Sequence, residues 1–320
     1  MIVRWGLDEL DGLLRELGIE RPYAIASDRW ANLPLRTTGR WSEVPTARIA
    51  DVAEGAADAD GLLAVGGGSA IDLAKAVSSE TGLPVVSVPT TYSGSEWTQF
   101  FGIRHPDRRM AGGGAGAHLA GIVYEPRLTV DLPHAESGGT ALNALAHSAE
   151  ALYVAGHNPD GDREALIGAS LIGESLPRVL ADGHDLEART RLLEGAQHAG
   201  AALGSAGLAL GHAMAQAVGG RYGIAHGAAN ALCLAPALRF NEPVAGEAIA
   251  RFGEALGADD PPTRVEELAR LGGFTRLREL GVPEDELDEV AEATVQRAGA
   301  KANPRQASAA EVAELFRSIW

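Results

Sequence analysis

The chain has 320 residues, of which 46% are hydrophobic, 22% charged and 5% aromatic, a composition that is typical of folded globular proteins and excludes disorder and collagen. The length exceeds what one hydrophobic core usually serves, so we expect two domains. The 27 Lys and Arg against 43 Asp and Glu give a net charge of −16, which excludes nucleic acid and anionic membranes as partners because the overall field repels polyanions.

The cysteine content and the first residues bear on the compartment. The single cysteine, Cys233, can form no internal disulfide and no multi-cysteine metal site. Residues 1–9 hold no apolar signal core, and no run approaches the ~20 apolar residues of a membrane span. We therefore expect a cytoplasmic protein that does not associate with membranes.

The first part of the chain alternates short apolar runs with amphipathic stretches, a pattern typical of strand–helix–strand units and a mainly parallel sheet. The predicted strands are residues 23–26, 62–65, 84–88 and 121–124, and a helix is predicted over residues 70–79. The glycine-rich residues 112–116 predict a mobile loop or a tight turn, because each glycine loses much backbone freedom in a regular element.

The sequence changes character near residue 131. From Asp131 onward, Ala- and Leu-rich stretches of helical period are broken by Gly and Pro, without convincing alternation of period two. We therefore predict an α/β dinucleotide-binding domain over residues 1–132, with a mainly parallel sheet. An all-helical substrate and catalytic domain is predicted over residues 133–320.

Three consecutive glycines follow the second predicted strand, where it turns into a helix. Gly66, Gly67 and Gly68 let the backbone approach a phosphate, whose charge is favoured by the free amides and dipole of a helix N-terminus. The alternative is a tight turn capped by Ser69. Asp28 follows the first predicted strand, where it can accept from a ribose 2′-hydroxyl and repel a 2′-phosphate, or only cap a turn.

Residues 89–96 read PTTYSGSE and carry five hydroxyl-bearing side chains within residues 90–95. Such a density of donors at the carboxyl edge of a parallel sheet suits a polyoxygenated ligand. A polar loop with hydroxyl turns is the alternative when this segment is considered alone.

The helical half contains four candidate side chains for chemistry. Asn143 and His147 lie four residues apart on one helix face, and His212 and His226 follow further along the chain. Three imidazoles and an amide can bind a divalent ion, but without a carboxylate the set is electrostatically poor for iron. The alternative is an imidazole cluster that recognises an anionic substrate and delivers a proton.

Several motifs, taken in order, resemble those of one family. They are VGGGS at 65–69, PTTYSGSE at 89–96, YEPRLT at 124–129, NALAHSAEALY at 143–153, residues 212–220, and NPR at 303–305. Over nearly its whole length the chain resembles the iron-containing alcohol dehydrogenase superfamily, and within it the maleylacetate reductases. PTTYxGSE and NAxAHxxEALY are specific, whereas GGGS is shared much more widely.

The resemblance implies the fold and the cofactor site. The fold would be the dehydroquinate synthase-like architecture of the iron alcohol dehydrogenases, with the substrate in the cleft between the domains. A nicotinamide dinucleotide would bind through Gly67, Gly68, Ser69, Thr90 and Thr91. The acidic Asp28 favours NADH, with NADPH as the alternative. Arg109 stands where the family has Lys, and would face either the cofactor or a substrate carboxylate.

The resemblance also implies the reaction. In metal-dependent members an Asp and three His hold the ion. Here Asn143 stands at the Asp position, as is usual in maleylacetate reductases, and His147, His212 and His226 stand at the His positions. Maleylacetate reductases are regarded as metal-independent, and they reduce a carbon–carbon double bond with hydride from NADH or NADPH to give 3-oxoadipate. These four residues are the catalytic candidates, and the ligands if metal is bound.

We therefore predict an NAD(P)H-dependent, metal-independent reductase of maleylacetate or a related unsaturated keto acid, acting in aromatic degradation. His212 or His226 would stabilise the enolate or donate a proton. We expect a small anionic substrate and a homodimer. Two alternatives stay open: a metal-dependent alcohol dehydrogenase with Asn143 as a weak ligand, and a lyase or cyclase of secondary metabolism on the same scaffold.

Overall fold

The computed structural model describes residues 1–104, 110–113 and 116–320, which form two compact units. Unit 1 comprises Met1–Thr91 and Ser95–Thr129, and unit 2 comprises Tyr92–Gly94 and Val130–Trp320. The chain thus enters unit 2 for three residues before it returns to unit 1. Within the described ranges, no helix has the length and apolar content that a membrane crossing requires.

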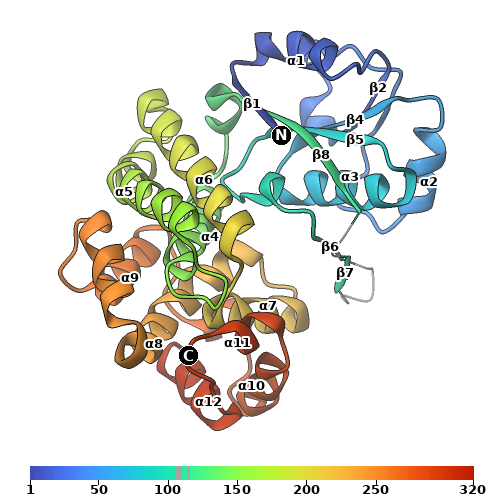
Figure 1. The fold of residues 1–320 in the computed structure, drawn as a ribbon. Coiled ribbons are helices and arrows are strands. Elements are labelled where there is room, and N and C mark those ends of the chain that lie inside the picture. Colours follow the sequence, from blue (N-terminus) through green and yellow to red (C-terminus); the bar gives the residue numbers. More distant parts are fainter. Residues whose placement is uncertain (105–109, 114–115) are drawn as a thin grey trace. The chain divides into compact units, whose positions relative to one another are not determined.

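Unit 1 is built around a six-stranded sheet of order β1-β8-β5-β4-β2-β3, in which every pairing is parallel (Figure 1). Its strands are β1 (Ile2–Trp5), β2 (Pro22–Ala26), β3 (Gly39–Trp41), β4 (Gly61–Gly66), β5 (Pro84–Pro89) and β8 (His118–Tyr124). A separate antiparallel hairpin consists of β6 (Phe101–Arg104) and β7 (Met110–Gly113).

Helices cover both faces of this sheet (Figure 1). They are α1 (Leu10–Glu16), α2 (Ile49–Gly55) and α3 (Gly68–Thr81). Leu62 of β4 packs with Val52 and Ile71, from α2 and α3. The next residue, Leu63, packs on the opposite face with Leu13 of α1. Strands covered on both faces are continuous apolar runs, and the predicted α/β class and its four predicted strands are confirmed.

Some elements of unit 1 differ from the prediction. The edge strands β1 and β3 are short and only partly buried, so they lack the apolar runs that mark central strands. Gly112 and Gly113, predicted in a loop or turn, lie instead in β7 opposite Gly102 and Phe101. The prediction was wrong for these two glycines because pairing with a neighbouring strand outweighs weak intrinsic strand preference.

The strand order creates a switch point between β2 and β4. From β2 the chain continues to β3 on one side, whereas from β4 it continues to β5 on the other. Ligands of open α/β sheets bind beyond the carboxyl ends of the strands at such a point. Because Ala26 pairs with Val65, the residues that follow β2 and β4 lie at the same edge of the sheet.

Unit 2 consists mainly of helices, as the sequence predicts. They are α4 (His134–Ala151), α5 (Pro159–Ala181), α6 (Leu186–Ala206), α7 (Leu210–Tyr222), α8 (His226–Leu256), α9 (Pro261–Leu271), α10 (Leu287–Val295), α11 (Ala298–Ala302) and α12 (Ala309–Ser318). Residues 141–151 of α4 are all buried. Polar side chains in such a helix need hydrogen-bonding partners, which makes the polar residues of α4 informative.

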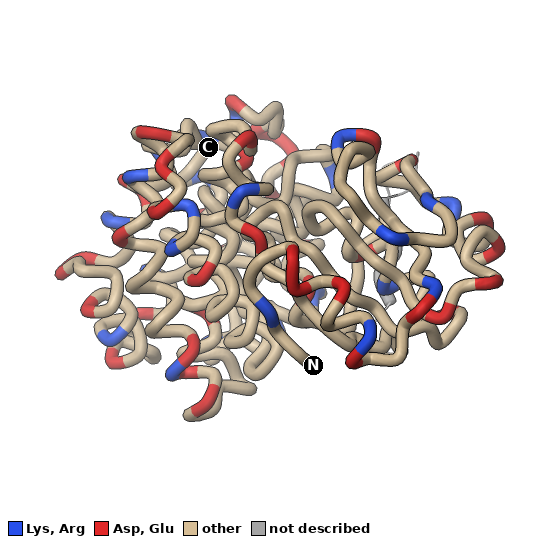
Figure 2. Tube along the Cα trace, turned by 90° about the horizontal axis from the view of Figure 1, so that it is seen from above, with Lys and Arg blue, Asp and Glu red and all other residues tan. Residues whose placement is uncertain are grey.

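Acidic and basic residues are interspersed along the chain in both units (Figure 2). The net charge of −16 is therefore not gathered in one segment. Binding of any anion must depend on individual hydrogen-bond donors and cations, because the net charge itself repels anions.

Candidate functional site

The glycine stretch joins β4 to α3 at the switch point. Gly67 is the N-cap of α3, and among the described residues no side chain caps the first turn, which contains Gly68 and Ser69. Ser69 is thus not the cap. A Cβ atom on Gly67 would lie 2.8 Å from Cγ2 of Thr91, and the φ of Gly66 is 154°. Glycine fits this turn without displacing its neighbours, and the uncapped helix N-terminus suits a phosphate.

The hydroxyl-rich segment begins after β5, beside the same glycines. The backbone amide of Thr90 donates to the carbonyl oxygen of Gly66 over 3.0 Å. Thr91 lies against Gly67, and its Oγ1 is buried without a partner among the described residues. A buried hydroxyl is seldom left unpaired in a native protein. The residues present therefore fit a dinucleotide phosphate that supplies the missing hydrogen bond.

Asp28 lies at the same edge, in a 3-10 turn that follows β2. Its side chain is 88% exposed, and Nη2 of Arg40 lies 4.0 Å from its Oδ1. Arg40, in β3, also donates to the carbonyl oxygens of Ala26 and Ser27. A cation beside the acid offsets part of any repulsion of a 2′-phosphate. The other cofactor candidate, Arg109, lies outside the described residues.

An ion pair between a buried lysine and a partly buried aspartate, which the sequence analysis missed, holds the hydroxyl-rich segment. Nζ of Lys75, on α3, lies 2.8 Å from Oδ1 of Asp72. The same Nζ donates to the carbonyl oxygens of Ser95 and Phe100. The Asp72 carboxylate accepts from Oγ of Ser95 and the amide of Gly102. The visible signal is the i, i+3 spacing of opposite charges just after the glycines.

Unit 2 brings the three candidate histidines together from three helices. His147 lies on α4, His212 in the first turn of α7 and His226 at the start of α8. The rings of His147 and His212 stack, with centroids 4.8 Å apart and planes at 17°, and those of His212 and His226 are 5.8 Å apart. His147 and His212 are buried, whereas His226 is exposed. The three residues form an imidazole cluster with one ring at the surface.

Glu150, also on α4, determines the orientation of His212. Its Oε2 lies 2.8 Å from Nδ1 of His212, and both side chains are fully buried. The carboxylate also accepts from the backbone amides of Ala209 and His212. Because a carboxylate only accepts, Nδ1 carries the proton and Nε2 remains available. The sequence analysis missed Glu150, although its i, i+3 spacing from His147 was visible.

Asn143 is held at both ends of its amide. Its Nδ2 donates to the carbonyl oxygen of Ser93 over 3.1 Å, and its Oδ1 accepts from Nδ2 of Asn230 over 2.8 Å. Asn230, a residue that the sequence analysis missed, lies 3.0 Å from Nε2 of His226. A carboxylate at position 143 would face the carbonyl oxygen of Ser93, acceptor against acceptor. The local structure therefore suits an amide at this position.

The cluster contains unused hydrogen-bonding capacity. Burial, followed by the nearby His212 and His226, holds the pKa of His147 well below its usual range, so this imidazole is neutral at pH 7. Four buried atoms have no partner among the described residues: Oγ of Ser93, Nδ1 of His147, Nε2 of His212 and Oδ1 of Asn230. Because buried polar atoms are rarely unpaired, this set fits a bound ligand that carries polar groups.

The same donor set fits a divalent metal poorly. Oδ1 of Asn143 already accepts from Nδ2 of Asn230, so the amide offers no free oxygen to an ion. The lone pairs of an imidazole lie in the ring plane, so stacking sets those of His147 and His212 side by side. In the part of the chain that the structure describes, no three His, Cys, Asp or Glu side chains converge as metal ligands. The four candidates also lack a carboxylate, which hard divalent ions favour.

Comparison with known proteins associates this arrangement with one family. The family described as iron-containing alcohol dehydrogenase matches residues 24–117. The C-terminal part of the Fe-containing alcohol dehydrogenase family matches residues 138–320, more than half of the chain. The two matches include the glycine turn and all three histidines of the cluster.

Individual proteins agree with the family match. The maleylacetate reductase of Pseudomonas knackmussii is 36% identical over 264 residues, which cover 82% of this chain and 74% of that protein. The structure of an iron-containing alcohol dehydrogenase from Corynebacterium glutamicum has a TM-score of 0.91 at 29% identity, covering 100% of this chain and 94% of that one. The structure of a maleylacetate reductase from Agrobacterium tumefaciens has a TM-score of 0.88 at 27% identity, covering 100% and 95%.

Proposed function

Because the chain belongs to the iron-containing alcohol dehydrogenase superfamily, in its maleylacetate reductase branch, we propose that it reduces the carbon–carbon double bond of maleylacetate or a related unsaturated keto acid. Membership makes the chain an NAD(P)H-dependent oxidoreductase. The amide of Asn143 is the observation that favours this reduction over metal-dependent alcohol oxidation, because Ser93 and Asn230 already form hydrogen bonds with both of its ends. It does not supply the anionic ligand that a metal-dependent alcohol dehydrogenase uses.

A nicotinamide dinucleotide supplies the hydride when it is bound. We assign its phosphates to the glycine turn and the start of α3, through Gly67, Gly68, Ser69, Thr90 and Thr91. Asp28 would accept from the adenine ribose and favour NADH. The uncapped helix N-terminus and the unpaired Oγ1 of Thr91 support this assignment.

The imidazole cluster would stabilise the negative charge that hydride addition creates on the substrate, and would supply the proton that neutralises it. When the β-carbon of an enone-like acid accepts hydride, charge moves to the carbonyl oxygen, and a proton is needed to complete the reduction. We assign the transfer of this proton to His212: Glu150 keeps Nδ1 protonated and leaves Nε2 without a partner, so Nε2 would first take up a proton and then pass it to the substrate. His226, which is exposed, would exchange protons with solvent. Asn143 and His147 would shape the pocket around the acid.

We propose that this reaction needs no metal ion. The support is the chemistry of the donor set: a neutral amide that is already bonded on both sides, and two imidazoles that stack. The proposal also includes a cytoplasmic homodimer. A buried and free Cys233 is compatible with a reducing compartment, and sedimentation velocity would give the oligomeric state.

The test is an NADH-oxidation assay on protein dialysed against a chelator and checked for metal by mass spectrometry. Maleylacetate and related unsaturated keto acids are supplied with NADH, and simple alcohols with NAD⁺. We expect NADH consumption in equal amount to 3-oxoadipate formed, unchanged by chelation. Alcohol oxidation that returns only with added iron or zinc would establish the alcohol dehydrogenase alternative. Substrate conversion without net NADH consumption would establish a lyase or cyclase.

A further inference from the structure

Arg189, in the first turn of α6, is a guanidinium almost completely buried in unit 2, with 1% of its surface exposed. Its hydrogen bonds run from Nε to the carbonyl of Gly183, from Nη1 to Oη of Tyr92 and Oγ of Ser137, and from Nη2 to the carbonyls of Val130 and Leu132. A guanidinium has five N–H donors, so all of them are used. Each acceptor is a neutral oxygen, although burying a cation is costly.

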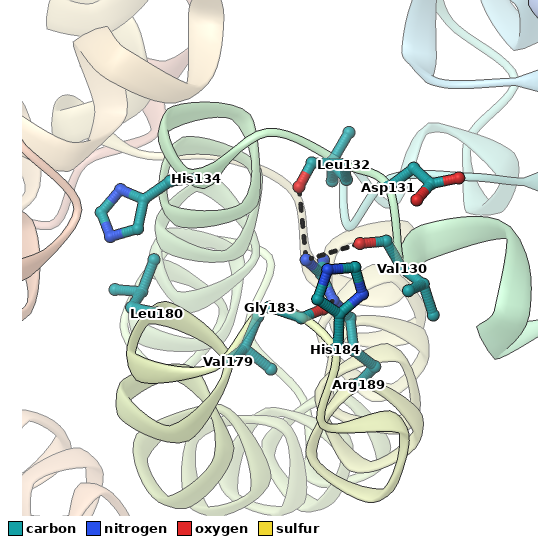
Figure 3. A pocket seen from close by; sticks show the side chains of 9 residues that line it. All are labelled: Val130, Asp131, Leu132, His134, Val179, Leu180, Gly183, His184 and Arg189. Atoms are coloured by element: carbon teal, nitrogen blue, oxygen red, sulfur yellow. Dashed lines mark hydrogen bonds between the residues drawn. The ribbon is translucent and has the colours of Figure 1, made fainter.

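Arg189 also forms part of the wall of a cavity of about 350 Å³, which His134 and His184 line as well (Figure 3). The dashed lines of Figure 3 run from the guanidinium to the carbonyl oxygens of Val130 and Leu132. Because every N–H group is already bonded, the guanidinium has no donor left for an anion in this cavity. Its role must lie in what it connects.

The connection that matters for chemistry is the one to Tyr92, whose side chain is fully buried. Tyr92 is the first of the three residues, Tyr92–Gly94, that belong to unit 2. Its backbone amide donates to Oγ1 of Thr140 on α4. The next residue, Ser93, accepts from Nδ2 of Asn143. Gly94 follows with a φ of 72°, and a Cβ atom on it would lie 3.3 Å from Nδ1 of His147.

We infer that Arg189 is a positioning residue for the proposed reaction: through Oη of Tyr92 it holds Ser93 and Gly94 against Asn143 and His147. This inference rests on the proposed function, since that function makes Asn143 and His147 part of the active site. Small displacements of positioned groups can cost as much as about 100-fold in rate. A loose Tyr92 would allow such a displacement without removing any group that touches substrate.

The experiment compares two variants that each remove one acceptor from the same Nη1 atom. Tyr92→Phe deletes only the hydroxyl, and Ser137→Ala deletes only the other oxygen. A structural role alone predicts similar losses of melting temperature and the same kcat for both variants. Positioning predicts that Tyr92→Phe lowers kcat by about tenfold with little change in KM for the keto acid, while Ser137→Ala stays within about twofold of wild type. Equal kcat values in the two variants would overturn the inference.

A second measurement does not depend on turnover. The imidazole NMR signals of His147 should shift in Tyr92→Phe and stay in place in Ser137→Ala, because only the tyrosine adjoins Ser93 and Gly94. If the wild-type protein reduces no unsaturated keto acid and this contrast persists, the proposed function fails while the positioning role stands. If the His147 signals are the same in both variants, the positioning role fails whatever the substrate.

Arg189→Ala provides a variant for the case in which Tyr92→Phe does not fold. The deleted side chain would open onto the cavity of Figure 3, so a small cation can enter. Millimolar guanidinium should restore kcat to Arg189→Ala, and methylammonium should not, because an ammonium group has three N–H donors for the five acceptors that Arg189 leaves behind. Equal effects of the two salts would count against the inference.

Discussion

Oε2 of Glu150 lies 2.8 Å from Nδ1 of His212, and neither side chain is exposed. Two backbone amides complete the carboxylate's hydrogen bonds, so its position is fixed before any ligand binds. An imidazole held at Nδ1 presents Nε2 in one tautomer and one direction. This pair supports the proposal that His212, rather than either of its neighbours, passes the proton to the substrate through Nε2.

Glu150→Gln should lower kcat by about 10- to 100-fold, because an amide in place of the carboxylate no longer fixes the tautomer of His212. Steady-state kinetics with saturating NADH measure the effect. Glu164→Gln is the matched control, since Oε2 of Glu164 lies 2.6 Å from Nδ1 of His198, and neither residue belongs to the imidazole cluster. Similar kcat values in the two variants would remove Glu150 from the mechanism.

The central strands could be predicted because burial on both faces leaves a clear pattern. Residues 62–65 of β4 form an apolar run whose members are all buried. The edge strand β1 leaves no such pattern, since its residues are only partly buried and include Arg4. The hairpin of β6 and β7 is held by pairing between backbones, and glycines at 112 and 113 carry no side-chain preference that would indicate it.

The three imidazoles of the site could be predicted from the sequence, whereas the residues that form hydrogen bonds with them could not. A histidine in an Ala-rich helix is conspicuous, whereas Glu150 resembles a solvated helix charge until packing buries it. Arg189 bonds to Tyr92 across 97 positions of sequence. No local spacing encodes such a contact, because the tertiary arrangement of α4 and α6 creates it.

Asn143→Asp should increase affinity for zinc or iron and lower kcat. The new carboxylate supplies an anionic ligand, yet it loses the donation to Ser93 and faces that carbonyl oxygen instead. Mass spectrometry for iron, zinc and nickel would show metal in the variant only. Near-stoichiometric metal in the wild type, with activity lost on chelation and restored on its return, would refute the metal-independent reaction.

Gly67→Ala should weaken NADH binding by at least about tenfold, since the new Cβ would lie 2.8 Å from Cγ2 of Thr91 and disturb the turn to which we assign the phosphates. Calorimetric titration of the folded variant measures the affinity. Gly12→Ala in α1 is the control, because a Cβ there meets nothing within 4 Å. Unchanged affinity in Gly67→Ala would mean that the glycines only make a tight turn.

Asp28 and Arg40 should move cofactor preference in opposite directions. NADH is expected to be preferred over NADPH, and Asp28→Ser should narrow the ratio of kcat/KM values, because it removes the charge that repels a 2′-phosphate. Arg40→Gln should widen the ratio, because it removes the cation 4.0 Å from the Asp28 carboxylate. If both variants keep the wild-type ratio, the ribose lies elsewhere and Asp28 only stabilises the turn that contains it.

The last prediction concerns stability at low pH. Hydrogen bonds from the Arg127 side chain, together with one from the backbone amide of Leu7, lower the pKa of Glu125 to about 2. Burial of the carboxyl group acts in the opposite direction and raises the pKa, but by less. An unfolded Glu titrates near pH ~4.3, so the folded pKa is the depressed one. The stabilisation from this carboxylate is therefore fully present above pH ~4.3 and is lost as the pH falls toward 2.

Glu125→Gln should consequently lower the melting temperature at pH 7, where the wild-type carboxylate contributes on the order of 2 kcal/mol to the free energy of unfolding. The difference between variant and wild type should shrink between pH 5 and pH 2, because the wild-type side chain then becomes neutral as well. Thermal unfolding followed by circular dichroism over this range measures it, and taking the difference removes the titration of all other carboxylates. A difference that stays constant with pH would show that the charge of Glu125 contributes nothing, and that its hydrogen bond to Leu7 accounts for the whole effect.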